Sequence, residues 1–357
     1  MKTSGKVRLD LIKLYDKFLK ETLQGKRLQK NTKPVRESSI QPYVWLRKLL
    51  YDFSIEKEFP LTIISTKTLK KRGIEAEKKY WKSFYKKFTD YLYDDLDCYD
   101  NYVGSNITRL RAFFNYLNEE KDMDVGLFHK KFYAYSEDIE IVTLLPEQLN
   151  YLIYNTEFEA SLPEHLKKTK DMFVFGCTVA LRVSDIFKLT ENNVEFFNGK
   201  YYLKANSQKT STFTRIILPD YAVDIIKKRP KKQKTIFPEI SNARFNKNIK
   251  ALIEKTRWTS LQEKKRNKRG KPVQVYKNAK KKESYRFCDL ITSHTMRRTA
   301  ITTMLCLNMP ESLVRKISGH ADGSKEFYRY VQLSQKYMDA ETEKIFEQLK
   351  SKEWIHQ

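Results

Sequence analysis

The chain has 357 residues, and its 69 lysines and arginines against 44 aspartates and glutamates give a formal net charge of +25. This length allows two or three domains, and 22 Tyr with 21 Phe exclude a disordered chain, because disordered segments are poor in aromatic residues. The longest apolar run, 172–181, is too short to span a membrane, and the charge excess favours a polyanion as the partner.

The cysteines and the N-terminus indicate the compartment. Cys98, Cys177, Cys288 and Cys306 are scattered and have no CxxC spacing. Such thiols are typical of a reducing compartment, and their spacing argues against a zinc site or a disulfide framework. Residues 1–10 contain no hydrophobic signal core, so we expect a cytoplasmic protein with no membrane partner.

The first segment, 1–72, is basic and has few residues that mark element boundaries. Apolar patterns near 9–18 and 40–53 predict two amphipathic helices, joined by a basic linker at 25–36. We interpret this N-terminal extension either as an extra DNA-binding module or as a plain helical extension. The sequence does not decide between the two.

A helical DNA-binding domain of the core-binding type is predicted at 73–140. Trp81, Phe84, Phe88 and Leu92 have the spacing of one buried helical face, and 101–121 repeats this pattern. The outward side of the second helix carries hydroxyl and guanidinium groups, which suit phosphate contacts, although a plain solvated face has the same composition. The candidate DNA-binding residues on this helix are Thr108, Arg109 and Arg111.

Residues 141–357 predict a mixed α+β domain with a hydrophobic helix at 167–181. Asn198-Gly199 lies between two runs of aromatic and β-branched residues, which predicts a hairpin over 194–205 with a type I′ turn. A third strand is predicted at 213–218, and Lys209 lies on the turn that precedes it. The expected fold class is therefore mainly α with a small antiparallel β-sheet.

A strongly basic run covers 261–286, with eleven Lys or Arg against two Glu. An exposed charge run is usually solvated, but in a chain this basic we expect it to lie along a phosphate backbone. A short strand is predicted inside it at 273–276. The candidate DNA-binding residues of the run are Lys264, Lys265, Arg266, Lys268 and Arg269.

Two helices and an aromatic segment are predicted between 293 and 330. Ser293 is placed to cap a helix on which His294 and Arg297, three residues apart, project from one face.

A second helix is expected to begin at Pro310 and to stop at Ser318-Gly319, which leaves His320 just past its end. The aromatic segment that follows ends at Tyr330.

From 141 to its C-terminus, the chain resembles the catalytic domain of the tyrosine recombinases, the phage-integrase family of site-specific DNA recombinases. The segment ALRVSDIFKL (180–189) resembles the motif of the first family arginine, HTMR (294–297) reproduces the HxxR box, and SGH (318–320) resembles the LGH box. The residues in and around these motifs are most similar to those of integrases of mobile elements from gut anaerobes. The resemblance implies a catalytic set of Arg182, Lys209, His294, Arg297, His320 and Tyr330, with Asp185 at the acidic position of the first motif.

These residue types suit the cleavage of a phosphodiester. The non-bridging oxygens gain negative charge as the phosphorus becomes pentacoordinate, and two arginines can bind them bidentately. Histidines can donate hydrogen bonds to the same oxygens or move protons. A phenol with its ordinary pKa near 10 needs a base and nearby cations to attack, and Lys209 is the expected general acid for the departing 5′ oxygen. With arginines supplying the charge, we expect no metal ion and no other cofactor.

The resemblance also implies partners. Tyr330 would form a 3′-phosphotyrosyl link, and two strand exchanges would pass through a Holliday junction held by four protomers. The expected partners are double-stranded DNA with inverted-repeat core sites, three further copies of the chain on DNA, and a DNA-bending accessory protein. The free protein is expected to be a monomer, and a helix at 335–357 is expected to exchange between neighbours.

Three features depart from the family pattern. Ala180 stands where the family usually has glycine. The segment from His320 to Tyr330 is slightly longer than the common spacing, so Tyr328 competes as the nucleophile, although Phe327 gives Tyr330 the family's F-x-x-Y ending. Lys204, inside the second strand, is a weaker rival to Lys209.

Two other functions compete with recombination. A type IB topoisomerase shares the same chemistry and relaxes supercoils without exchanging partners. A DNA-binding regulator with a degenerate site belongs to another class, and the complete set of six residues argues against it.

Overall fold

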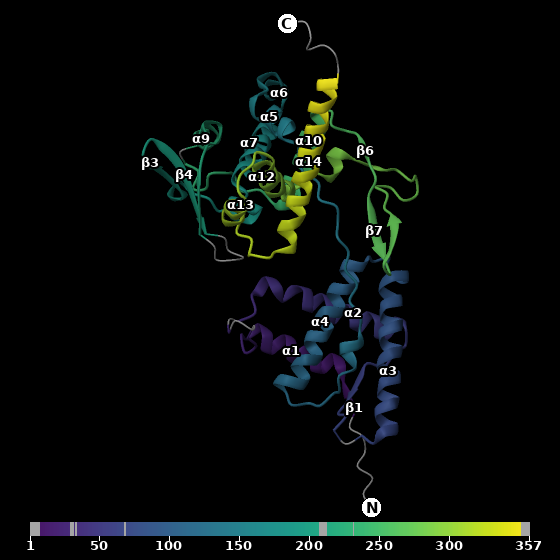
Figure 1. Cartoon of the computed structure of the whole chain (residues 1–357). Helices are drawn as coiled ribbons and strands as arrows, with labels where there is room; N and C mark the ends of the chain where they lie inside the picture. Colours follow the sequence, from purple (N-terminus) through teal and green to yellow (C-terminus); the bar gives the residue numbers. More distant parts are fainter. Residues whose placement is uncertain are drawn as a thin grey trace, which may run out of the picture. The chain divides into compact units, whose positions relative to one another are not determined.

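The computed structural model describes residues 8–28, 32, 34–67, 69–206, 213–230 and 232–350 (Figure 1). It is mainly helical with small antiparallel sheets, which confirms the predicted fold class. The chain divides into two compact units, Met1–Ile139 with Lys264–Val275 and Glu140–Glu263 with Tyr276–Gln357. In the described part of the chain, no helix combines the length and the apolar character that crossing a membrane requires.

The first unit is built around aromatic side chains from both of its predicted segments. Phe53 contacts Phe84 and Phe88 with ring centroids 5.8 and 5.3 Å apart. Residues from both sides of position 72 therefore bury their apolar faces in one core. The elements of this unit are β1 (Arg8–Asp10), α1 (Leu11–Leu23), α2 (Gln41–Glu56), β2 (Thr62–Ile64), α3 (Lys71–Asp90) and α4 (Asp100–Asn115).

A hairpin from far downstream completes the first unit. It consists of β7 (Lys265–Lys268) and β8 (Lys271–Gln274), and its turn residues Arg269 and Gly270 have φ angles of 52° and 76°. The backbone amides of both turn residues donate to the carboxylate of Asp100, at 2.7 and 2.8 Å. Asp100 is fully buried and also accepts from the hydroxyl of Tyr93 at 2.7 Å. Residues 264–275 of the basic run thus belong to the first unit as a folded element.

The second unit is organised around α7 (Glu164–Val179) and α12 (Ser293–Cys306). A Cβ atom at Gly176 would lie 2.5 Å from Met296 Sδ, so glycine is what allows these two helices to pack this closely. α12 lies among α7, α13 and α14 (Figure 1). The remaining helices are α5 (Pro146–Tyr154), α6 (Thr156–Ser161), α8 (Val183–Ile186), α9 (Asp220–Lys227), α10 (Asn242–Lys255), α11 (Phe287–Leu290), α13 (Glu311–Ser318) and α14 (Lys325–Lys350).

The second unit also carries the predicted three-stranded antiparallel sheet. Its order is β3 (Val194–Phe197), β4 (Lys200–Asn206) and β5 (Phe213–Ile217). Asn198 and Gly199 have φ angles of 50° and 74°, as the predicted type I′ turn requires. A short pair, β6 (Leu261–Gln262) with β9 (Tyr285–Arg286), closes the base of the insertion that contains the hairpin.

The C-terminal helix differs from the expected one. The sequence suggested a separate helix beginning near 335, but α14 runs unbroken from Lys325 and already contains Tyr330. No glycine or proline occurs within it, so nothing in the chain interrupts the helix. The hydroxyl of Tyr337 donates to Glu147 Oε1 at 2.6 Å and holds α14 against the start of α5.

We predict that Asp100→Asn loosens the first unit. The amide of asparagine has only one acceptor oxygen for the two backbone amides of the hairpin turn, and its NH₂ group would face one of them. Leaving that buried N–H without an acceptor should lower the free energy of unfolding by about 1–3 kcal/mol. Hydrogen exchange read by mass spectrometry should show faster exchange in α4 and in the hairpin. Asp97→Asn, at an exposed partner of Lys268, is the matched control and should change stability by about 0.5 kcal/mol or less. Equal exchange in the two variants would contradict the anchoring role of Asp100.

Candidate active site

The first arginine of the predicted set lies in the short connection between α7 and α8. α7 ends at Ala180, whose φ of 55° is left-handed, and Arg182 follows in an extended conformation as the cap of α8. A left-handed residue commonly ends a helix and is usually glycine, because a Cβ there costs about 1–2 kcal/mol. The alanine that departs from the family motif therefore occupies a position where the backbone favours glycine.

Arg297 joins three segments of the chain. Its guanidinium donates to the backbone oxygen of Ala180 at 2.8 Å and to that of Ser318. Burial, and then the nearby Arg182, lower the pKa of Arg297 to about 10, so it remains charged at neutral pH. Arg297 on α12 therefore connects the end of α7 to the end of α13, with the positive charge of Arg182 nearby.

The first turn of α12 is held by a neighbouring helix. The amide of Ser293 donates to Asn246 Oδ1 at 2.7 Å, and its hydroxyl donates to Asn242 Oδ1 at 3.0 Å. The cap of this helix is Thr292, one residue before the predicted Ser293, which is already helical and buried. His294 follows on the exposed side of this turn. The two asparagines of α10 were missed, although positions 242 and 246 continue the helix face that buries Ile249 and Ile253.

His320 lies just after the left-handed Gly319 that ends α13, as predicted. Its Nδ1 is 2.8 Å from Ser318 Oγ. Burial lowers the pKa of His320 to about 4, and the positive charges of Arg297, Arg182 and Arg315 add to this effect. The imidazole is therefore neutral near pH 7.

The two candidate tyrosines have different environments on α14. Tyr330 is 8% exposed, and its ring centroid lies 5.9 Å from that of His320. Tyr328 is 54% exposed, and the centroid of its ring lies 5.6 Å from Cζ of Arg315. Tyr330 therefore faces the side of the fold that holds His320, whereas Tyr328 faces outward.

Of the two candidate lysines, Lys209 lies outside the described residues. Lys204 lies on β4, where its amine pairs with Glu195 Oε1 at 2.7 Å. The same carboxylate also pairs with Arg215 at 3.0 Å. Lys204 is thus part of a surface network of charges on the sheet.

The predicted DNA-binding residues of α4 make contacts within the first unit. Thr108 donates to the backbone oxygen of Gly104 at 2.9 Å, which is a bond inside the helix. Arg109 reaches Asn106 Oδ1 at 3.4 Å. Arg111 donates to the backbone oxygen of Phe132.

The predicted cations of the hairpin are largely paired with carboxylates. Arg269 pairs with Asp94 at 2.7 Å and with Asp90 at 2.7 Å. Arg266 pairs with the buried Glu137 at 2.6 Å, and Lys268 pairs with Asp97. Lys264 precedes the hairpin and Lys265 is exposed on β7. Much of the positive charge assigned to DNA contacts is therefore balanced inside the first unit.

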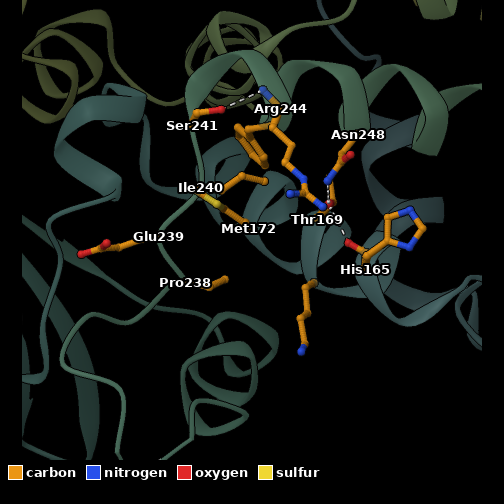
Figure 2. Close-up of a pocket in the computed structure, with 11 residues that line it drawn as sticks. His165, Thr169, Met172, Pro238, Glu239, Ile240, Ser241, Arg244 and Asn248 are labelled. Carbon is orange, nitrogen blue, oxygen red and sulfur yellow. Dashed lines mark hydrogen bonds between the residues drawn. The ribbon is translucent and has the colours of Figure 1, made fainter.

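A surface hollow of about 360 Å³ lies between α7 and α10, away from these residues. Figure 2 shows the Ser241 hydroxyl accepting from the Arg244 amide, and Asn248 donating to Thr169 across the two helices. The first contact caps α10, the second joins α10 to α7, and α10 in turn holds the first turn of α12. Among the described residues, no cluster of three or more His, Cys, Asp or Glu has metal-binding geometry.

Comparisons with known proteins give a family and a fold. The model of the phage integrase family matches residues 143–336, which is more than half of the chain. Among solved structures, a lambda integrase dimer bound to a COC′ core site shares 12% identity at a TM-score of 0.58, covering 91% of this chain and 77% of that one.

Two further structures are similar in fold. The Tn1549 transposon integrase in complex with transposon right end DNA shares 15% identity at a TM-score of 0.56, covering 91% of this chain and 94% of that one. XerH recombinase bound to a palindromic difH substrate shares 11% identity at a TM-score of 0.60, covering 94% and 96%. Among curated protein sequences, none matches the chain.

We predict that acid destabilises the fold through His320. Its pKa is about 4 in the folded chain against 6.5 ordinarily, so the unfolded chain binds more protons between these values. Stability should therefore fall as the pH is lowered from 6.5 to about 4. Urea unfolding across this range should show a shallower pH dependence for His320→Gln. His165→Gln, at an exposed position, is the control, and an equal slope in both variants would contradict the burial of His320.

Proposed function

The chain belongs to the phage integrase family and is a site-specific DNA recombinase, and we propose that it cuts and rejoins DNA through a covalent 3′-phosphotyrosyl link to Tyr330. The convergence of Arg182, Arg297, His320 and Tyr330 in the second unit carries this proposal. These residues are separated by up to 148 positions in sequence, and the contacts of Arg297 bring their segments together.

In the proposed cleavage step, the Tyr330 oxygen attacks the scissile phosphorus. One P–O bond forms to the phenol and the P–O5′ bond breaks, so the bond energy is kept in the protein–DNA link. Arg182 and Arg297 would bind the non-bridging oxygens, since fixed cations stabilise the charge that develops there. A guanidinium has five N–H donors, so Arg297 retains donors after its two backbone contacts.

Two proton transfers accompany this step. The phenol must lose its proton as it attacks, and the departing 5′ oxygen must gain one. We propose Lys209 for the second transfer, since a lysine ammonium can donate to an alkoxide. His294 and His320 would donate hydrogen bonds to the phosphate oxygens or move the phenol's proton. No step of this scheme uses a metal ion.

The proposed partners follow from recombination. We propose that the chain binds double-stranded DNA with inverted-repeat core sites and assembles as a tetramer there, with a DNA-bending accessory protein as a further partner. Ile345 and Phe346 are 55% and 57% exposed near the end of α14, which suits docking onto a neighbouring copy. The proposal also places the protein in the cytoplasm with its DNA. DNA relaxation of the topoisomerase type and a catalytically inactive regulator are the alternatives, and the family match favours neither.

We predict that Tyr330→Phe keeps DNA binding but forms no covalent adduct. A nicked duplex with the candidate core site traps the link, because the short strand that carries the leaving 5′ hydroxyl diffuses away. Denaturing gels should show the adduct for the wild type only. Tyr328→Phe is the matched control and should form adduct at the wild-type rate. If Tyr330→Phe still forms adduct and Tyr328→Phe does not, the nucleophile is Tyr328.

We predict that different lysines of the basic run contribute unequally to DNA binding. Lys280, Lys281 and Lys282 are exposed, and among the described residues we find no carboxylate paired with them. Replacing these three by Gln should reduce the slope of log affinity against log salt by roughly 0.9 for each phosphate that the variant no longer neutralises. Lys268→Gln should change the slope less, because its amine is already paired with Asp97. An unchanged slope in the triple variant would show that residues 280–282 do not contact the DNA.

A further inference from the structure

Ser318 and His320 form a hydrogen-bonded pair across the left-handed Gly319. The φ of 63° at Gly319 reverses the chain, so the side chains on either side of it meet. Ser318 is 2% exposed, and its Oγ is 2.8 Å from His320 Nδ1. The family motif has leucine at this position, which could not make this contact.

The hydroxyl of Ser318 has only one proton, and its position can be assigned. Ser318 Oγ lies 2.6 Å from the backbone oxygen of Val314, which is the distance of a short O–H···O bond. Without a proton between them, two oxygen atoms at this distance would repel each other. The hydroxyl therefore donates to Val314 and must accept from the histidine. This requires the proton of neutral His320 to be on Nδ1.

We propose that Ser318 is a positioning residue that holds His320 in its Nδ1–H tautomer, so that Nε2 accepts the phenolic proton of Tyr330 during cleavage. The inference rests on the proposed function and assigns one of its open proton transfers. The Tyr330 oxygen forms its bond to phosphorus, its proton moves to Nε2, and the P–O5′ bond breaks with protonation of the 5′ oxygen by the general acid. His294 is then left to donate a hydrogen bond to the phosphate.

The surroundings of His320 support a neutral base in the free protein. Positive charges from three other elements and the phenol of α14 face the imidazole, and the charges disfavour a cationic ring until the phosphate is bound. A bound phosphodiester brings negative charge between the arginines and so raises the basicity of Nε2 when it is needed. The titratable and charged groups around the ring are Arg182, Arg297, Arg315 and Tyr330, with Asp322 paired to Arg315 at 3.9 Å.

The tautomer can be measured directly on the full chain without DNA. In protein labelled with ¹⁵N-histidine, the ring nitrogen shifts and their long-range couplings to the ring protons distinguish the two neutral tautomers. The His320 signals are assigned by their absence in His320→Gln. Near neutral pH, we expect His320 in the Nδ1–H form, and Ser318→Ala should release it toward the Nε2–H form. A wild-type His320 in the Nε2–H form would overturn the proposal whether or not the chain cleaves DNA.

The kinetic test uses single-turnover cleavage of the nicked duplex. Ser318→Ala should cleave roughly tenfold or more slowly, because part of the general base is in the wrong tautomer, while its DNA affinity should not change. Ser318→Thr retains the hydroxyl and should recover most of the rate. Ser334→Ala is the matched control, since Ser334 is also buried and donates to a backbone oxygen, that of Val331, at 2.8 Å without contacting a histidine.

The outcomes separate this inference from the proposed function. Equal cleavage rates for Ser318→Ala and Ser334→Ala would overturn the role of Ser318 and leave the phosphotyrosyl mechanism intact. If the wild type forms no adduct at all, the proposed function fails, while the tautomer measurement still reports on the pair. Should Ser318→Ala fail to fold, the wild-type spectrum decides the matter by itself.

Discussion

The second unit depends on the placement of one guanidinium. Arg297 donates to backbone oxygens at the ends of α7 and α13, which are acceptors that a helix cannot satisfy by itself. The carbonyl ends of both helices carry partial negative charge, so a buried cation is stable there. Because each of these helices ends with a left-handed residue, Ala180 or Gly319, the chain turns sharply at both points and delivers Arg182 and His320 to the same place. One cation therefore holds these segments together, and in the proposed mechanism the same cation binds the phosphate.

Net charge overstates the positive surface that is open to DNA. The hairpin at 264–275 carries some of the densest positive charge, yet Arg266, Lys268 and Arg269 pair with carboxylates of the first unit. These pairs support the bonds from the hairpin turn to Asp100, so the charge contributes to folding. A charge of +25 still favours a polyanionic partner, but which cations meet that partner depends on the fold.

Local patterns in the sequence predicted local structure well. Asn198-Gly199 predicted the hairpin and its turn, because only a few residue types accept two successive positive φ angles. The spacing of His294 and Arg297 also predicted the helix that carries them, and Ser318-Gly319 predicted the end of α13. The anchoring of the 264–275 hairpin was not, because Asp100 and Glu137 lie more than 125 positions upstream and no local period marks the pairing. The hydrogen bond between Ser318 and His320 was missed for another reason: it depends on the backbone angle of Gly319, which a motif does not record.

The central claim is that Tyr330 becomes covalently bound to DNA, and the sequence allows a direct measurement. Trypsin cuts after Arg329, so Tyr328 and Tyr330 fall on different peptides, the second ending at Lys336. Mass spectrometry of the nuclease-trimmed adduct should find the nucleotide on the peptide 330–336, attached to Tyr330. A nucleotide on the peptide that contains Tyr328, or on a residue other than a tyrosine, would contradict the account.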